Sequence, residues 1–395
     1  MSKEKRRVPR LRFPGFTGDW EQRKLSDITE IVMGQSPSSK NYTDNPNDNI
    51  LVQGNADLKD GKVVPRLWTK EITKTIDKDG IILTVRAPVG DVAKTDYKVV
   101  LGRGVAGIKG NDYIYQFLQK LQNNRYWVSL SSGSTFESIN SNDIKDLIID
   151  IPSIEEQTKI SMLLNNVNSI ITLHQRKLNH LILKKKSLLQ KLFPKNGDRY
   201  PELRFPGFTD AWEQRKLSDV LVERNEQQVE TREYPLMSFV QGLGVTPKGE
   251  RYDRSFLVLD QSKKYKRTEL GDFIYSSNNL ETGSIGINKT GKAVISPVYS
   301  IFQGVSIGDS QFIGIMSLLP RFIAKMIRFR QGVVYGQWRI HETDFLDISV
   351  LIPSVDERTK ITQLILSIEE IITLHQRKLD HLQLQKKALL QQLFV

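Results

Sequence analysis

The sequence predicts an α+β protein in which two mixed α/β domains are separated by two long helices that pair as an antiparallel coiled coil, with pseudo-two-fold symmetry between the halves. Two observations lead to this prediction: a frame of segments occurs twice around unlike inserts, and a heptad pattern follows each insert. We therefore expect a first domain at residues 1–154 and a first helix at 155–195. A second domain at 196–354 and a second helix at 355–395 complete the chain of 395 residues.

The frame consists of three segments that return unchanged later in the chain. Two of them return 192 positions later, and the third returns 201 positions later. The stretches between them, 28–150 and 220–351, barely resemble each other. A repeated frame around two unlike inserts indicates a scaffold that presents two different recognition surfaces. The repeated pairs are Leu11–Thr17 and Leu203–Thr209, Trp20–Asp27 and Trp212–Asp219, and Ile170–Leu178 and Ile371–Leu379.

A helix start signal follows each insert. Ser153 stands three residues before Glu156, and Ser354 stands three residues before Glu357. This spacing predicts capping boxes, in which the serine side chain accepts a hydrogen bond from the N3 amide and the glutamate reaches back to the serine amide. Each helix would extend for about 37 residues, or about 55 Å at 1.5 Å per residue.

From these starts, apolar residues recur every seven positions in two rows, which is typical of coiled-coil helices. Eight of the ten positions in the rows are apolar in each helix. The polar positions are a histidine and a lysine in each helix, and the lysines are Lys185 and Lys386. The predicted pairing residues are Ile160, Leu164, Val167, Ile171, His174, Leu178 and Leu181 in the first helix, and Ile361, Ile365, Ile368, Ile372, His375, Leu379 and Leu382 in the second.

A narrow apolar seam needs a partner helix. The simplest partner for each helix is the other one, and an antiparallel pair would place the two inserts at opposite ends of a rod. Parallel pairing, or pairing with another chain, satisfies the same pattern. His174 and His375 lie near the middle of each seam, where a polar residue helps to fix the register of a coiled coil at some cost in stability.

Each insert predicts a mixed α/β domain of about 150 residues. Short apolar runs predict strands at 50–52 and 81–85 in the first insert, and at 273–275 and 293–295 in the second. Apolar residues at helical spacing predict one helix in each insert. These helices are expected at 112–130 and 312–330.

Composition excludes several classes of protein. The net charge of +12 favours a polyanionic partner such as nucleic acid, although no region is a strong basic block. The absence of cysteine excludes disulfides, thiolate nucleophiles and cysteine-based zinc sites. No apolar run reaches the roughly 18 residues of a membrane span, and the charged N-terminus lacks the apolar core of an export signal. We expect a cytoplasmic protein without membrane contact.

Neither insert carries a catalytic signature. Residues 286–293 are one residue short of a Walker A loop, because Ala293 stands where a Ser or Thr would bind magnesium, and a Gly-rich hairpin turn is the simpler interpretation. Three Asp-x-Lys tripeptides match only the end of a nuclease motif. The histidines on the helices are six apart, so neither pair shares a helix face for a metal. We expect no catalytic residue, no metal and no cofactor in this chain.

Polar loop residues in both inserts predict contacts with DNA bases. Asn and Gln amides pair with adenine, and Arg pairs with guanine. Any one of these residues is more often a solvated loop residue, but their recurrence in the loops of two inserts favours a DNA-reading surface. The predicted DNA-binding residues are Gln53, Asn55, Arg86, Ser134 and Thr135 in the first insert, and Gln241, Asn278, Asn279, Gln337 and Arg339 in the second.

The order of these motifs resembles the specificity subunit of type I restriction-modification systems. Residues 11–16 and 20–25 are similar to the segments that begin each target-recognition domain of this family. Thr84–Gly90 resembles its strand and Arg-x-Pro-x-Gly loop. Residues 133–144, followed by Ile151–Gln157, resemble its passage into the conserved helix. The second insert departs from this pattern at 276–280 and 336–340, as expected if it reads a different half-site.

The resemblance implies a mechanism. Each insert would be a target-recognition domain that grips one half of a split, asymmetric target in double-stranded DNA from the major groove. The helices would set the gap between the halves and dock two adenine methyltransferase subunits, and two restriction subunits would join them. S-adenosylmethionine, ATP and Mg would belong to these partners, so this chain would be a non-catalytic subunit. Lys184, Lys185 and Lys186 would contact a partner or phosphate, or form a solvated face with one lysine in the seam.

Three other interpretations make different predictions. A stand-alone bipartite DNA-binding regulator would bind its target without a methyltransferase partner. An enzyme would show metal-dependent or ATP-dependent turnover by itself. A coiled-coil linker would need no large inserts, and the two inserts found here argue against it.

Overall fold

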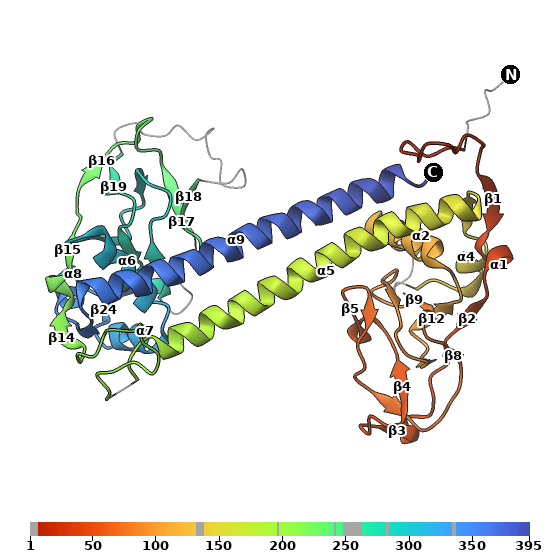
Figure 1. The fold of residues 1–395 in the computed structure, drawn as a ribbon, viewed down its shortest axis with the longest axis horizontal. Helices are drawn as coiled ribbons and strands as arrows, with labels where there is room; N and C mark the ends of the chain where they lie inside the picture. The colour runs from red at the N-terminus through yellow and green to blue at the C-terminus, as the bar shows by residue number, and fades with distance from the viewer. Residues whose placement is uncertain are drawn as a thin grey trace. The chain divides into compact units, whose positions relative to one another are not determined.

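The computed structural model describes residues 7–131, 138–195, 197–240, 242–247, 263–280, 284–333 and 337–395 (Figure 1). The chain forms two compact units. Unit 1 contains the residues up to Arg176 together with Gln376–Val395, and unit 2 contains Lys177–His375. The division falls within the two long helices, so each helix contributes one part to each unit. Both units are described separately below.

Unit 1 is built on two sheets and a two-stranded ribbon. The strand order is β2-β12-β9-β10-β6-β5 in the larger sheet and β3-β7-β4-β11-β8 in the smaller one, while β1 pairs with β13. Its elements are β1 (Glu21–Lys24), α1 (Leu25–Ile28), β2 (Ile31–Met33), β3 (Tyr42–Thr43), β4 (Asn49–Val52), β5 (Leu58–Lys59), β6 (Lys62–Val63), β7 (Trp68–Thr69), β8 (Thr75–Ile76), β9 (Ile81–Thr84), β10 (Val92–Lys94), β11 (Val99–Leu101), β12 (Val105–Ile108), α2 (Asp112–Asn123), α3 (Tyr126–Leu130), α4 (Ser141–Lys145) and β13 (Ile148–Ile151).

Unit 2 repeats the ribbon and the central sheet in a smaller form. The strand order is β15-β23-β20-β21 in one sheet and β16-β19-β22 in another, and the pairs β14-β26, β17-β18 and β24-β25 form ribbons. Its elements are β14 (Glu213–Lys216), β15 (Leu221–Glu223), β16 (Gln227–Gln228), β17 (Met237–Val240), β18 (Gly244–Pro247), β19 (Tyr265–Thr268), β20 (Phe273–Tyr275), β21 (Ile285–Ile287), β22 (Ala293–Ile295), β23 (Ser300–Gly304), α6 (Ile307–Met316), α7 (Pro320–Ile327), β24 (Gln331–Val333), β25 (Gln337–Arg339), α8 (Glu342–Leu346) and β26 (Ser349–Ile352).

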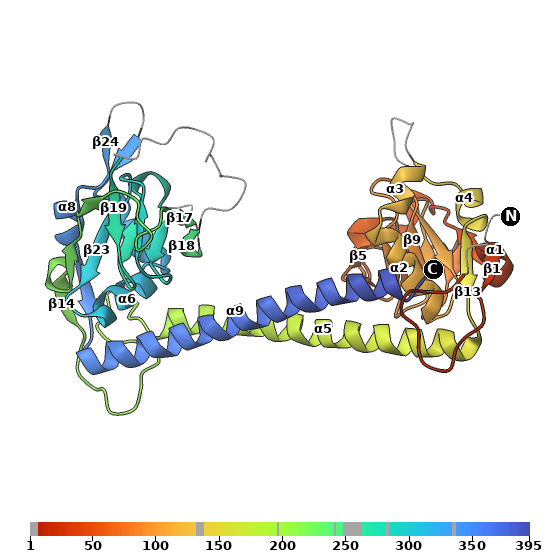
Figure 2. The ribbon, with the colours of Figure 1, turned by 90° about the horizontal axis from the view of Figure 1, so that it is seen from above.

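The two long helices are α5 (Ile154–Lys191) and α9 (Val355–Gln392), each of 38 residues. In unit 1, Ile160 and Leu164 near the start of α5 share a core with Leu390 and Leu393 at the end of α9 and in the residues that follow it. Figure 2 shows α2, which packs on the same core, beside the sheet that contains β9. The start of one helix therefore lies against the end of the other, which is antiparallel pairing.

Unit 2 shows the same direction of pairing. Ile361 and Ile365 near the start of α9 share a core with Leu189 and Leu192 around the end of α5. Because both units give the same answer, parallel pairing is excluded, and the prediction of two mixed α/β parts with antiparallel long helices is confirmed. Burying these seams in the two cores supplies most of the stability of such long helices, since helix propensity alone contributes little.

Two predicted helices are each interrupted. The helix expected at 112–130 is α2 followed by α3, because Arg125 between them takes a left-handed conformation with φ of 53°, which an α-helix does not accommodate. The helix expected at 312–330 is α6 followed by α7, with Pro320 at the first position of α7. A proline at this position lacks the amide that would continue the preceding helix.

Of the two hydrogen bonds predicted for each capping box, the one accepted by the serine side chain is confirmed. Ser153 Oγ accepts a hydrogen bond from the Glu156 amide at 3.3 Å, and Ser354 Oγ accepts one from the Glu357 amide at 3.4 Å. The expected return contact from each glutamate is wrong. Both carboxylates instead accept hydrogen bonds from an arginine far away in the chain, as described next.

Candidate nucleic-acid interface

The repeated Leu-Arg-Phe-Pro-Gly-Phe segments, which we call the arms (residues 11–16 and 203–208), fasten the long helices. Arg12 donates from Nε and Nη2 to the Glu156 carboxylate at 2.8 and 2.9 Å. In unit 2, Arg204 donates from the same atoms to Glu357 at 2.7 and 2.8 Å. The two glutamate side chains are only 2% and 1% exposed, so each depends on its arginine for a counter-charge. These hydrogen bonds raise the pKa of both guanidinium groups.

Each arm also touches the opposite helix. In unit 1 the Leu11 amide donates to the Gln392 carbonyl in the last turn of α9 at 2.9 Å. In unit 2 the Leu203 amide donates to the Lys191 carbonyl in the last turn of α5, also at 2.9 Å. An arm thus joins the start of one helix to the end of the other, and satisfies a carbonyl that has no partner within its own helix. The repeated sequence therefore encodes the antiparallel pairing.

The predicted pairing residues are largely shielded from solvent. Most are buried, and none is exposed. Ile160, Leu164, Leu178, Leu181, Ile361, Ile365, Ile368, Leu379 and Leu382 are buried, while Val167, Ile171, His174, Ile372 and His375 are half-buried.

The seam lysines differ between the units. In unit 2, Lys185 Nζ lies 2.6 Å from Glu369 Oε1 on α9, and Lys289 pairs with the other oxygen of the same carboxylate. Burial alone would raise the pKa of Glu369, but the two lysines lower it. In unit 1, the equivalent lysine is Lys386, and the residue 201 positions before Glu369 is Asn168. Burial lowers the pKa of Lys386 to about 8, and it has no ion pair with any residue that the structure describes.

The predicted DNA-binding residues of unit 1 lie on neighbouring turns. Gln53 and Asn55 follow β4, where the buried Asp57 carboxylate accepts hydrogen bonds from the Gln53 and Gly54 amides. A side chain at Gly104 would come within 2.1 Å of the Gln53 carbonyl, so the turn after β11 runs directly against this loop. Asn55 is exposed, whereas the side-chain amide of Gln53 already donates from Nε2 to Tyr42 Oη at 2.7 Å. Asn55 is therefore freer than Gln53 to reach a base.

Arg86 joins the same group of turns. The amide of Val85, which precedes it, donates to the Gly104 carbonyl at 2.9 Å, and Arg86 forms a bridge with Ser138. The exposed Arg103, which the sequence analysis missed, lies on the turn between these loops, and its amide donates to Ser36 Oγ. The Gly-Arg-Gly sequence at 102–104 was the signal that could have revealed it. Ser134 and Thr135 lie outside the described residues.

Two of the predicted residues of unit 2 lie side by side, on the loop after the central strand β20 and on β25. Asn278 Oδ1 accepts a hydrogen bond from the Trp338 amide on β25 at 2.6 Å, which brings Asn278 beside Arg339. Arg339 is half exposed and lies 3.6 Å from Glu342, so its charge is only partly compensated. Trp338, which is 49% exposed, is a further candidate that the sequence analysis missed. Gln241 and the side chains of Asn279 and Gln337 lie outside the described residues.

The same backbone arrangement supports both candidate surfaces. In unit 1 the amide of Ile139 donates to the Val85 carbonyl, and in unit 2 the amide of Ile340 donates to Ser277 Oγ. Both isoleucines are buried, so the segment leading to α4 or α8 is held against the loop that follows the central strand. Unlike side chains are thus presented from matching loops.

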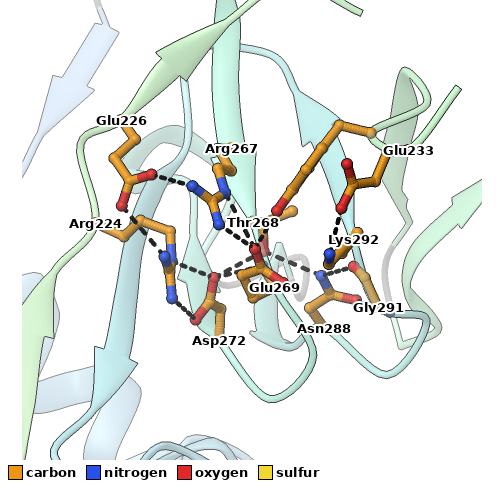
Figure 3. A network of polar contacts seen from close by, with 11 residues as sticks. Arg224, Glu226, Glu233, Arg267, Thr268, Glu269, Asp272, Asn288, Gly291 and Lys292 are labelled. Carbon is orange, nitrogen blue, oxygen red and sulfur yellow. Dashed lines mark hydrogen bonds and ion pairs between the residues drawn. The ribbon is translucent and has the colours of Figure 1, made fainter. Parts of the chain in front are cut away.

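The loop at 286–293 is fixed by contacts within unit 2. Asn288 organises its turn, because its side chain accepts from the Thr290 and Gly291 amides. Lys292 pairs with Glu233, as Figure 3 shows, so this cation is compensated within the unit. The expected hairpin is also wrong, because β21 pairs with β20 while β22 pairs with β19 in the other sheet.

A second set of charges in unit 2 is internally compensated. Figure 3 shows Arg224 between Glu226 and the buried Asp272, and Arg267 between Glu226 and Glu269. Burial raises the pKa of Asp272 despite hydrogen bonds from the Glu269 amide and Arg224. These arginines hold β15, β19 and β20 together and are poor candidates for phosphate contact.

The described part of the chain lacks the features of a metal site and of a membrane-spanning helix. No group of three or more histidine, aspartate or glutamate side chains there could hold a metal ion. No helix there is long and apolar enough to cross a membrane.

Comparison with known proteins identifies related sequences and a related fold. The family model of the type I restriction modification DNA specificity domain matches residues 17–183. A Methanocaldococcus jannaschii protein, assigned as the specificity subunit of the type I restriction enzyme MjaX, is 30% identical over 182 residues, which are 44% of this chain and 42% of the relative. The MjaIX specificity subunit of the same organism is 28% identical over 180 residues, 42% of this chain and 41% of the relative. The match thus spans less than half the length of these curated relatives.

The fold similarity covers nearly the whole chain. The crystal structure of a type I restriction-modification system S subunit from M. genitalium superposes with a TM-score of 0.67, covering 98% of this chain and 99% of that one. Only 14% of the residues are identical, so this similarity shows a shared fold.

Proposed function

Because residues 17–183 match the family model of the type I restriction modification DNA specificity domain, we propose that this chain is the subunit that reads a bipartite, asymmetric DNA target for a methyltransferase complex. The observation that carries the proposal is the matched placement of unlike side chains. Arg86 follows the central strand β9 of unit 1 and bridges to Ser138, while Asn278 follows the central strand β20 of unit 2 and is bonded to the strand that carries Arg339. Two readers with different side chains on one scaffold suit a target with two unlike halves.

Charge supports direct reading of bases by these loops. Arg86 and Arg103 are exposed and carry no ion pair with the residues that the structure describes, while the neighbouring cation Arg66 is paired with Asp57. Uncompensated arginines can donate two parallel hydrogen bonds to guanine, and asparagine can do the same with adenine. Their position on turns allows insertion into the major groove. We propose that unit 1 and unit 2 each read one half-site, and that α5 and α9 set the number of unspecified base pairs between them.

Exposed leucines on the long helices support docking of partner subunits. Unit 1 presents Leu173 from α5 and Leu384 from α9, and unit 2 presents Leu183 from α5 and Leu374 from α9. All four are more than half exposed, which is unusual for leucine on a coiled coil with a buried seam. The same pair in each unit suits two copies of one partner. We propose that these partners are adenine methyltransferase subunits, with restriction subunits joining them, and that S-adenosylmethionine, ATP and Mg bind to those subunits.

The proposal is tested by mapping N6-methyladenine across a genome with and without this gene, in cells that carry a matching methyltransferase subunit. A split motif that disappears on deletion is the expected result, and unchanged methylation with an active methyltransferase would contradict it. Exchanging residues 220–351 for the same region of a relative is expected to change one half of the motif only. A change in both halves would contradict the assignment of one half-site to each unit.

A further inference from the structure

A pocket of about 500 Å³ opens on unit 2, beside the end of α5. Its floor is apolar and includes Phe193, Trp212 and Phe322. Its wall includes two cations from α7, Arg321 and Lys325. The combination of an apolar floor with cations at the side is suited to a ligand that carries both an acidic and an apolar group.

Two donors at this pocket lack acceptors. The Trp212 side chain is 1% exposed, and its indole Nε1 has no hydrogen-bond partner among the described residues. Arg321 is half-buried and forms no hydrogen bond or ion pair with any described residue, and burial lowers the pKa of its guanidinium. A buried donor without an acceptor and a partly desolvated cation without a counter-charge are both costly. A carboxylate in the pocket would compensate the charge of Arg321, whereas Trp212 Nε1 is buried beyond its reach, as Trp20 Nε1 is in unit 1.

The equivalent place in unit 1 contains an acid. Asp150 on β13 lies opposite Gln22 on β1, and the corresponding pair in unit 2 is Leu351 opposite Gln214. The pocket wall therefore has leucine where unit 1 has a carboxylate. The loss of this acid from unit 2 leaves room for an acid that comes from outside the unit.

Unit 1 also indicates what kind of molecule fits there. Lys120 is the cation near Asp150, and burial lowers the pKa of its ammonium group, while the charge of Asp150 raises it. Lys120 Nζ donates to the carbonyl of Val395 at 2.6 Å, so a main-chain oxygen satisfies this cation in unit 1. The residue 201 positions before Val395 is Pro194, which lines the pocket of unit 2. Lys325 Nζ donates to the Ser349 carbonyl there, whereas Arg321 has no such acceptor among the described residues.

We propose that this pocket binds an acidic peptide segment of another chain, whose carboxylate accepts hydrogen bonds from Arg321 while a neighbouring apolar side chain rests on the aromatic residues of the lining. Charge complementarity supports this occupant. Lys195 and Arg199 add positive charge at the rim, against the single acid Asp198. The inference does not depend on the DNA-reading role.

The test is calorimetric titration of the full chain with an acetylated heptapeptide, Ala-Leu-Asp-Phe-Glu-Leu-Ala, and with the same peptide carrying Asn and Gln in place of its acids. The acidic peptide is expected to bind at least about tenfold more tightly, because a charge-assisted hydrogen bond is lost in the neutral one. Arg321→Gln is expected to remove this preference. The matched control Arg328→Gln changes an exposed arginine at the end of the same helix, outside the pocket lining, and is expected to keep it.

A second variant tests the comparison of the units. Leu351→Asp gives unit 2 the acid that unit 1 carries, so it is expected to pair with Arg321 and to weaken binding of the acidic peptide. Equal binding of the two peptides to the wild-type chain, or an undiminished preference in Arg321→Gln, would overturn the proposal. Phenylacetate that binds as tightly as the peptide would also overturn it, because the site would then recognise small carboxylates.

Discussion

Lys386 offers the sharpest test of how the long helices are held together. It lies in the seam within unit 1, where burial lowers its pKa from 10.5 to about 8. At about 1.36 kcal/mol per pH unit, this gap corresponds to at most about 3 kcal/mol of unfavourable energy for the buried charge. Partial solvation of the side chain reduces the figure, so we expect Lys386→Met to stabilise unit 1 by about 1–2 kcal/mol at neutral pH.

The dependence on pH has a definite sign. In the unfolded chain a lysine keeps its proton up to about pH 10.4, whereas Lys386 in the folded chain releases it near pH 8. Between these values the unfolded state binds more protons, so the stability of the wild-type protein rises with pH in this window. The advantage of Lys386→Met should therefore be full below about pH 8 and should shrink as the pH approaches 10.

The assay is urea unfolding at about pH 7 and about pH 9.5, with amide exchange of residues 376–392 followed by mass spectrometry. Lys185→Met is the matched control, because Lys185 is paired with Glu369 and its removal is expected to destabilise unit 2. Asn168→Glu supplies the acid that unit 1 lacks, and should also stabilise unit 1 at neutral pH. An advantage of Lys386→Met that stays constant with pH, or a loss of stability at pH 7, would refute the reasoning.

Three further predictions concern the arms, the reading loops and the outer faces of the helices. Arg12→Ala is expected to lower the free energy of unfolding by about 3 kcal/mol, because it leaves the buried Glu156 carboxylate unpaired. Arg12→Lys should recover only part of this loss. Equal stability of the wild type and both variants in urea would contradict the prediction. In a polarisation assay, Arg103→Ala should weaken DNA binding, and should either reduce the dependence of affinity on salt or relax specificity at one target position. The control Arg23→Ala changes an arginine that is already paired with Glu21 within β1, and should leave DNA affinity and specificity unchanged. Replacing Leu173 and Leu384 together by serine should abolish capture of a methyltransferase subunit at unit 1 while DNA binding persists, which co-elution and polarisation measure side by side.

The periodic features of the fold could be predicted from the sequence, whereas its long-range contacts could not. The residues of the heptad rows are buried or half-buried along α5 and α9, as local spacing leads one to expect for a coiled coil. The antiparallel direction was predicted as the simplest arrangement and not from the seam itself, since both directions bury the same seam. The contact of Arg12 with Glu156 spans 144 positions, and the local capping rule assigned that glutamate to its own helix start instead. Local rules fail where a distant charge competes for the same group.

The candidate site was predicted at the level of loops and not of side chains. Residue type alone selected Gln53, yet its amide is already bonded to Tyr42, and only the packing of two loops shows this. Arg103 was not selected from the sequence, because its turn is close to Asn55 and Arg86 in space but distant from them in the chain. Charge counting could not separate these arginines from Arg224 and Arg267, whose partners neutralise them within unit 2.

The contacts of the arms explain why the frame repeats while the inserts differ. Each arm acts through an arginine with the first turn of one helix and through an amide with the last turn of the other, and both of these arm residues belong to the frame. A ring of the arm completes the contact, since Lys159 lies 4.8 Å from the centre of the Phe16 ring and Lys360 lies 4.9 Å from that of Phe208. Because the arm contacts involve no residue of the reading loops in the described part of the chain, those loops can change without disturbing the contacts. A scaffold fastened in this way can accept new recognition surfaces one unit at a time.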